Sequence, residues 1–171
     1  LLMKNKINIK NNIFRKIYSK AKEYLPDAED LFLKKSIMAQ YEECYSEQYS
    51  GNKKLNLDKI IDIINYLSSK IKDLYLVKLV KLMWYIDFLY YKHYDCGITG
   101  LCYFKAPLGA LPKAYEKIIL LDGIKRQEEI FDDNIGIKFV VSEGFRVSNL
   151  EKKEINIVDI AKIIKSFVFL P

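Results

Sequence analysis

Apolar positions recur at helical spacing along most of the chain. Residues 57–70 carry a wide apolar stripe, and Asn56 just before them is a residue type that caps helix N-termini. Residues 76–91 predict a further helix, and its second half is apolar nearly all round, as is typical of a buried central helix. Residues 157–167, with Asn156 as their cap, predict a last helix.

The part of the chain before these helices is also helical in pattern. Residues 12–24 and 27–45 both place apolar side chains at helical spacing, and Pro26 separates the two stretches. A polar loop follows them. We therefore expect a helical N-terminal extension over residues 1–52 and a separate domain over residues 53–171.

The pattern changes from helix to turn between residues 97 and 112, where glycine and proline are frequent. Within this stretch residues 101–104 predict a short strand, and residues 113–121 return to a helix. Residues 127–131 and 136–147 predict two strands joined by a turn. The expected fold is a mainly helical α+β domain with a central buried helix and a small antiparallel sheet.

Composition and charge exclude few classes of function. Half of the residues are hydrophobic, 13% are aromatic and the formal net charge is +6, which fits a globular protein and permits contact with nucleic acid or an acidic protein. No apolar run approaches the roughly 20 residues of a membrane span, and the start lacks the long apolar segment of a signal peptide. Three cysteines form no secreted disulfide framework. These features predict a soluble cytoplasmic protein without membrane contact.

The search for catalytic or metal-binding residues is mostly negative. His93 is the one histidine, and no G-x-S-x-G or cysteine-nucleophile context accompanies it. A Cys3His zinc site from His93, Cys44, Cys96 and Cys102 would lack the close C-x2-C pairs that such sites usually show. A P-loop and a G-x-G-x-x-G motif are both missing from the sequence. We therefore expect no enzyme, no cofactor and no metal.

Asp87 is the most informative single residue, because it lies inside the most apolar helix. A buried carboxylate is costly unless it is hydrogen-bonded or paired, so Asp87 needs partners. Candidates are a tyrosine hydroxyl, a lysine, or backbone N–H groups of the loop that follows. One interpretation is an acid or base of shifted pKa. The favoured interpretation is structural, with the carboxylate attaching the loop to the helix.

Two further features fit a binding surface. Tyrosines crowd the region around the central helix, and tyrosine is both an interface anchor and ordinary core material. The basic residues of the stretch 1–25 would suit phosphate contacts. That stretch shows no helix-turn-helix, so a solvated basic face is the favoured interpretation.

The segment from about Leu74 to Pro112 resembles the signature of the Panacea, or SocA-like antitoxin, domain. That signature reads approximately K-L-x-K-L-L-Y-Y-A-D-F-L-H-Y-K-K-Y-G, then I-T-G-x-x-Y-x-K-x-P-Y-G-P-V-P. The positions in register are Asp87, Tyr91, Lys92, Thr99, Gly100, Tyr103, Lys105, Pro107, Gly109 and Pro112. The chain departs from the signature at Asp95, where glycine is usual, and in the stretch 107–112, which lacks a tyrosine and a proline.

The resemblance implies an antitoxin that neutralises a toxin by direct protein–protein binding and carries no catalytic residues. The candidate partner-binding residues are Tyr85, Tyr94, Thr99, Tyr103, Lys105, Pro107, Leu108, Gly109, Pro112 and Tyr115. Asp87 is the structural polar anchor. Two alternatives stay open: a phage-encoded protein that inhibits a host enzyme or defence complex, and a DNA-binding regulator that uses the basic N-terminal helix. Nucleic acid and a second copy of the chain are secondary candidate partners.

Overall fold

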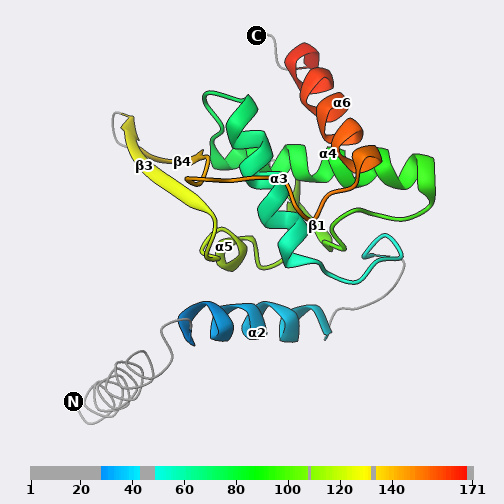
Figure 1. Ribbon diagram of the computed structural model, residues 1–171, viewed down its shortest axis with the longest axis horizontal. Coiled ribbons are helices and arrows are strands. Elements are labelled where there is room, and N and C mark those ends of the chain that lie inside the picture. Colours follow the sequence, from blue (N-terminus) through cyan, green and yellow to red (C-terminus); the bar gives the residue numbers. More distant parts are fainter. Residues whose placement is uncertain (1–27, 43–48, 108, 132–133, 169–171) are drawn as a thin grey trace. The chain divides into compact units, whose positions relative to one another are not determined.

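A computed structural model of the chain describes residues 28–42, 49–107, 109–131 and 134–168 (Figure 1). The chain divides into two compact units, Leu1–Ser36 and Ile37–Pro171. The described residues form five helices and two antiparallel two-stranded sheets, which confirms the mainly helical α+β class. The helix predicted over residues 12–24, with its basic side chains, lies outside the described residues. The boundary predicted at residue 52 stays a prediction.

Helix α2 (Ala28–Glu42) begins in the first unit and ends in the second. In the first unit Asp30 and Lys34, one turn apart, form an ion pair with a nitrogen–oxygen distance of 2.8 Å. In the second unit Tyr41 is buried and donates a hydrogen bond to the carbonyl oxygen of Lys113 at 2.8 Å. This contact attaches the end of α2 to the chain at residue 113.

Helices α3 (Leu57–Lys70) and α4 (Leu76–Tyr94) supply much of the core of the second unit. Helix α3 has the predicted bounds, and helix α4 runs one turn beyond the predicted end. Helix α4 packs against α6 (Lys152–Val168) and β2 (Gly109–Pro112). Helix α3 packs against β4 (Asn134–Val140) and α6 (Figure 1). The central position of α4 explains why its sequence is apolar on nearly every side.

Asn56 caps helix α3 as the sequence predicted, and its side-chain oxygen accepts a hydrogen bond from the Lys59 N–H at 2.9 Å. Replacing Asn56 with alanine is expected to lower the free energy of unfolding by about 1 kcal/mol, because this N–H loses its acceptor. Urea denaturation measures the loss. The matched control is Asn156→Ala, an exposed position inside α6, where alanine is the better helix former and no loss is expected. Equal losses in both variants would contradict the assignment of the cap.

Helix α6 (Lys152–Val168) begins five residues before the predicted start at 157, so Asn156 lies inside the helix and its predicted role as a cap is wrong. Glu151 is the residue before the helix, and its N–H donates a hydrogen bond at 2.9 Å to the carboxylate of Glu154 in the first turn, which stabilises this start. Glu154 is buried, and its other oxygen pairs with the Lys59 ammonium at 2.5 Å. This ion pair joins α3 to α6.

The two sheets are separate hairpins. Strands β3 (Lys125–Phe131) and β4 (Asn134–Val140) pair in antiparallel register, and the N–H of Phe139 donates to the Leu74 carbonyl at 2.8 Å. The strand predicted over 127–131 is confirmed. The strand predicted over 136–147 is wrong beyond residue 140, because the chain there leaves the sheet to reach α6.

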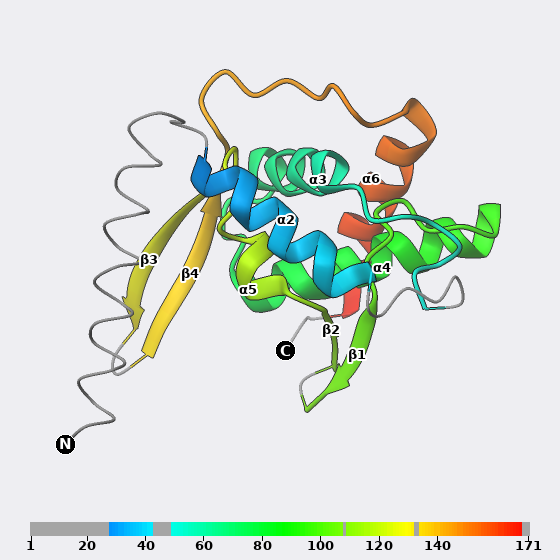
Figure 2. The same ribbon diagram turned by 90° about the horizontal axis from the view of Figure 1, so that it is seen from below.

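Strands β1 (Tyr103–Ala106) and β2 (Gly109–Pro112) form the other hairpin, which extends away from α4 in Figure 2. The strand predicted over 101–104 begins two residues too early, and β2 was not predicted. Helix α5 (Tyr115–Ile118) follows and is shorter than the predicted range of 113–121.

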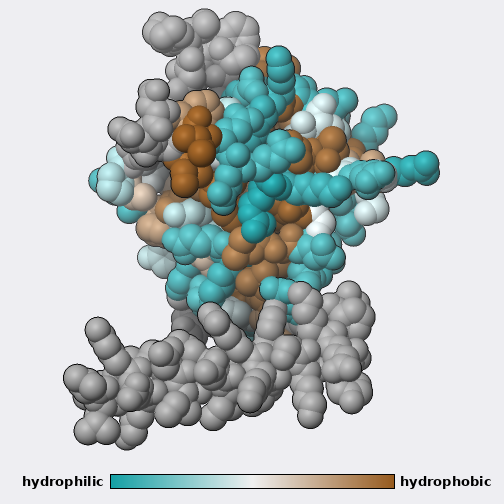
Figure 3. All heavy atoms as spheres, turned by 90° about the vertical axis from the view of Figure 1, so that its left-hand side faces the viewer, coloured by the Kyte–Doolittle hydropathy of each residue, from teal (hydrophilic) through white to brown (hydrophobic). Residues whose placement is uncertain are grey.

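The surface of the second unit is not uniformly polar. Figure 3 shows apolar residues exposed among hydrophilic ones on the face that carries the β3–β4 hairpin. Near the end of that hairpin Ile130 and Ile135 are 79% and 67% exposed. No helix in the part of the chain that the structure describes is long and apolar enough to cross a membrane.

Candidate functional site

The carboxylate of Asp87 lies in the middle of α4, buried, and accepts four hydrogen bonds. One oxygen accepts from the N–H groups of Ile98 and Thr99, each at 2.9 Å. The other accepts from the Tyr103 hydroxyl at 2.8 Å and from the Thr99 hydroxyl. Backbone N–H groups of the following loop and a tyrosine hydroxyl are two of the kinds of partner that the sequence predicted. The residues 98–103 are therefore attached to α4 through one side chain.

The electrostatics of Asp87 follow from this arrangement. Burial raises the pKa of the Asp87 carboxyl above its ordinary value, and the hydrogen bonds from Thr99, Tyr103 and Ile98 act against the rise. Burial and the nearby carboxylate raise the pKa of the Tyr103 hydroxyl well above its ordinary value. Each carboxylate oxygen already takes two donors, which fills its lone pairs. This favours the structural interpretation of Asp87 over a catalytic acid or base.

Backbone contacts hold the same loop from its other side. The N–H of Asn56 donates to the Thr99 carbonyl at 2.9 Å, and the N–H of Lys113 donates to the Cys102 carbonyl at 2.8 Å. Gly100 has a φ of +72° and packs so closely that a Cβ there would lie 2.3 Å from the Lys54 carbonyl oxygen. The loop is therefore fixed between α4 and the segment that leads into α3, and it presents the β1–β2 hairpin in one position.

A groove lies between this hairpin and the first turns of α4. Its volume is about 320 Å³, and its walls are mostly apolar. From α4 it is lined by Leu76, Val77, Val80 and Lys81, and from the hairpin and α5 by Ala106, Pro107, Gly109, Ala110, Leu111 and Tyr115. We call this set the hairpin groove. Its rim is open, since Val77 is 53% exposed.

The predicted partner-binding residues divide into three groups. Pro107, Gly109 and Tyr115 line the hairpin groove, and Lys105 is exposed on the neighbouring strand β1. Leu108 lies outside the described residues.

The residues of the second group are buried or already form hydrogen bonds within the fold. Thr99 is fully buried, Pro112 is buried, and Tyr103 donates its hydroxyl hydrogen to Asp87. Thr99 lies in the loop before the hairpin, and Tyr103 and Pro112 pair where its two strands begin and end. The side chain of Tyr103 also lines a cavity.

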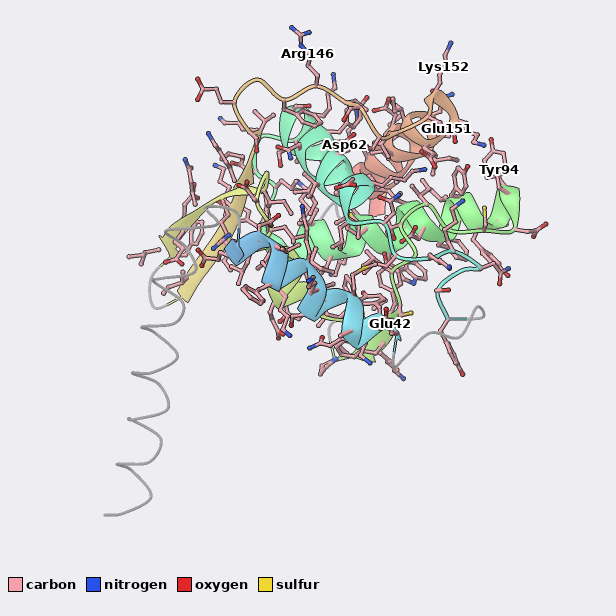
Figure 4. All side chains as sticks on the ribbon, turned by 60° about the horizontal axis from the view of Figure 1, so that its bottom comes forward. Glu42, Asp62, Tyr94, Arg146, Glu151 and Lys152 are labelled. Atoms are coloured by element: carbon pink, nitrogen blue, oxygen red, sulfur yellow. The ribbon has the colours of Figure 1, made fainter. Side chains whose placement is uncertain are left out.

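The third group lies on α4 and is not part of the lining of the hairpin groove. Tyr85 is half-buried, with its ring edge-to-face against Trp84. Tyr94 lies at the C-terminal end of α4, where it is 47% exposed and the Lys153 ammonium is 5.6 Å from its ring centroid (Figure 4). Neither Tyr85 nor Tyr94 lines the hairpin groove, although Tyr85 lies one turn from Lys81, which does.

Residues considered for catalysis or zinc binding are scattered. His93 is exposed near the end of α4, Cys96 is half-buried and Cys102 is buried. Cys44 lies outside the described residues. In the described ranges no three or more histidine, cysteine, aspartate or glutamate side chains form a group that could hold a metal ion.

A second buried carboxylate, Asp62 on α3, was missed by the sequence reasoning (Figure 4). It accepts hydrogen bonds from the N–H groups of Ser148 and Asn149 at 2.9 and 2.7 Å. The segment between β4 and α6 is thereby attached to α3. The signal was available, because Asp62 interrupts an apolar run between Ile61 and Ile63, just as Asp87 does in α4.

Comparison with known protein families identifies a match over the second half of the chain. The sequence model of a family described as "Antitoxin SocA-like, Panacea domain" matches residues 79–168, which include Asp87, the loop, both hairpins and α6. No curated protein and no solved structure matches the chain.

Proposed function

Because the chain belongs to the family of SocA-like antitoxins with a Panacea domain, we propose that it neutralises a toxin by binding to it directly. The proposed contact surface is the hairpin groove with the neighbouring side of β1. The role is stoichiometric: the bound chain covers the functional face of the toxin and performs no reaction on it.

The observation that carries this proposal is the attachment of the hairpin to α4 through Asp87. Four hydrogen bonds to one buried carboxylate fix the loop that precedes β1. A surface that is already ordered loses little conformational entropy when a partner binds, so more of the contact energy appears as affinity. The hairpin groove is such a surface, and its apolar walls are what the centre of a protein interface requires.

Exposed apolar side chains beside the groove extend the same surface. Phe104 on β1 is 49% exposed and Val77 on α4 is 53% exposed. A stable interface buries about 800 Å² on each partner, which is more than the groove alone provides. The toxin is therefore expected to cover the groove, the outer side of β1 and the first turn of α4 together.

The direct test is co-expression with the protein encoded by the neighbouring gene. We expect that protein to arrest growth when expressed alone, growth to return when this chain is co-expressed, and the two chains to co-purify. A neighbour that is harmless alone, or a pair that fails to co-purify, would contradict the proposal. Growth arrest of cells by this chain itself would instead favour a phage-encoded inhibitor of a host protein.

A pair of variants tests the surface. Val77→Glu places a charge on the rim of the hairpin groove, at an early helical position where a carboxylate is favourable for the helix. We expect this variant to weaken toxin binding about 30-fold or more, as loss of an interface hot spot does. Ile130→Glu near the end of the β3–β4 hairpin makes the same change at a more exposed position and is expected to leave binding within about threefold. Calorimetric titration measures both, and the reverse ranking would move the interface to β3–β4.

A further inference from the structure

A small pocket farther along the same face of α4, about two turns after the residues of the hairpin groove, is lined mainly by aromatic side chains. Its volume is about 190 Å³. Its side-chain walls include Tyr49, Trp84, Asp87, Phe88, Tyr91 and Tyr103. We call it the aromatic pocket. Ligand sites for small molecules usually measure about 300–1,000 Å³, so this volume suits a single side chain better than a cofactor or metabolite.

The aromatic rings of α4 are ordered and partly exposed. Trp84 and Phe88, one turn apart, stack with their ring centroids 5.1 Å apart and an angle of 9° between the planes. Phe88 is 45% exposed and Tyr91 is 43% exposed. The faces of aromatic rings carry partial negative charge and attract a cation placed over them. The pocket therefore offers several such faces in a fixed arrangement.

Oxygen atoms add to the negative character of the pocket wall. A Cβ at Gly97 would lie 3.4 Å from a carboxylate oxygen of Asp87, 3.6 Å from the Ser50 carbonyl oxygen and 3.8 Å from the Gly51 carbonyl oxygen. Glycine leaves that space open to the pocket. Among the described residues that line the pocket, Asp87 is the one charged group, and none is a lysine, arginine or histidine. The charge of the lining is complementary to a cation.

We propose that the aromatic pocket binds one positively charged side chain, lysine or arginine, of a protein partner. The proposal rests on the proposed function, because it gives the toxin a basic residue that this chain recognises. The cation lies over the rings of Phe88 and Tyr91 and faces the oxygen atoms around Gly97. The hydrogen bonds of Asp87 to the loop stay in place, and the carboxylate acts on the cation through its charge.

The chain itself provides a reporter for this site. Trp84 is the only tryptophan in the sequence, so its fluorescence and its indole N–H resonance in nuclear magnetic resonance report on the aromatic pocket. The probe is the capped tripeptide acetyl-Gly-Arg-Gly-amide, titrated into the full chain at constant ionic strength. We expect a saturable change with a Kd of about 1–10 mM, as a single side chain gives. The same peptide with citrulline, which has the shape of arginine without its charge, is expected to bind at least about tenfold more weakly. Equal responses to the two peptides, or no response to either, would overturn the proposal.

Variants of exposed aromatic residues test whether the arginine peptide binds in the aromatic pocket or elsewhere on the surface. Phe88→Leu and Tyr91→Leu each remove an aromatic face and are expected to weaken binding of the arginine peptide about fivefold. Phe131→Leu removes a ring of similar exposure on β3, outside the pocket and the proposed toxin surface, and is expected to leave binding unchanged. Unchanged binding in both α4 variants would contradict the proposal, and circular dichroism shows that each variant is folded.

The two proposals fail in different experiments. If the toxin co-purifies with the chain but the arginine peptide does not bind, the aromatic pocket has no cationic ligand and the proposed function stands. If the peptide binds but no toxin co-purifies, the antitoxin function fails and the cation site stands as a property of the chain.

Discussion

Replacing Asp87 with alanine is expected to lower the free energy of unfolding by at least about 3 kcal/mol. The buried N–H groups of Ile98 and Thr99 would lose the carboxylate that accepts their hydrogen bonds at 2.9 Å. Each unsatisfied buried donor costs about 1–3 kcal/mol. The Tyr103 hydroxyl loses the same acceptor, so the hairpin loosens together with the loop. Urea denaturation followed by circular dichroism measures the loss.

The matched control is Asp87→Asn, which keeps the shape of the side chain and removes the charge. Its oxygen can still accept from Ile98 and Thr99, and its amide can donate to the hydroxyl oxygens of Thr99 and Tyr103, which accept as well as donate. We expect a loss of about 1 kcal/mol or less. An asparagine variant as unstable as the alanine variant would show that the charge of Asp87, and not its hydrogen bonds, holds the loop.

A comparison of the unmodified chain with Asp87→Asn also predicts an unusual dependence of the free energy of unfolding on pH. Because burial raises the pKa of folded Asp87 above its ordinary value, the folded state holds this proton more tightly than the unfolded state. The stabilisation from protonated Asp87 is complete below about pH 4 and is lost as the pH rises through the folded pKa. Tyr103, whose pKa is raised well above its ordinary value, does not titrate in this range. The unmodified chain should therefore lose stability relative to Asp87→Asn as the pH rises from 4 to 7, and the opposite slope would contradict the raised pKa.

The elements that the sequence predicted well are those whose signals are local. The stripe over residues 57–70 and the cap at Asn56 together define α3, because apolar periodicity and capping both act within a few residues. The start of α6 was misplaced since Asn156 has the chemistry of a cap, whereas the buried ion pair of Glu154 with Lys59 on α3 stabilises an earlier start. That choice depends on a residue nearly a hundred positions away and cannot be read from the local pattern.

The difference between local and long-range signals also explains which parts of the candidate site could be predicted from the sequence. Asp87 could be identified because one carboxylate in an apolar helix breaks the pattern, and its cost when unpaired requires donors nearby. Strand β2 could not, because its four residues from Gly109 to Pro112 have little β propensity and pair only through β1. The aromatic pocket was also beyond prediction, since its walls come from the segment before α3, from α4 and from the loop at 97–103. Only the folded chain brings these three segments together.

Replacing Gly100 with alanine is expected to lower the free energy of unfolding by about 2–4 kcal/mol, for two reasons that add. A Cβ at this position would lie 2.3 Å from the carbonyl oxygen of Lys54 and 2.6 Å from the Leu55 nitrogen. Both are backbone atoms, so neither can rotate away, and overpacking of this kind costs about 1–3 kcal/mol. The φ of +72° adds about 1 kcal/mol for any residue with a Cβ. The segment before α3 must therefore separate from the loop at Thr99.

The matched control, Gly144→Ala, separates the two contributions. Gly144 has a φ of +69°, almost the same as that of Gly100, but no atom lies within 4 Å of a Cβ built there. Alanine at 144 should therefore cost only the conformational strain, about 1 kcal/mol, and urea denaturation of the two variants gives the cost of the clash as their difference. A difference near zero would show that the loop moves freely away from Lys54, and the hairpin groove would then not be a preformed surface. A difference of about 2 kcal/mol or more would show that the contact between the loop and the segment before α3 holds the hairpin in place, as the proposed binding mode requires.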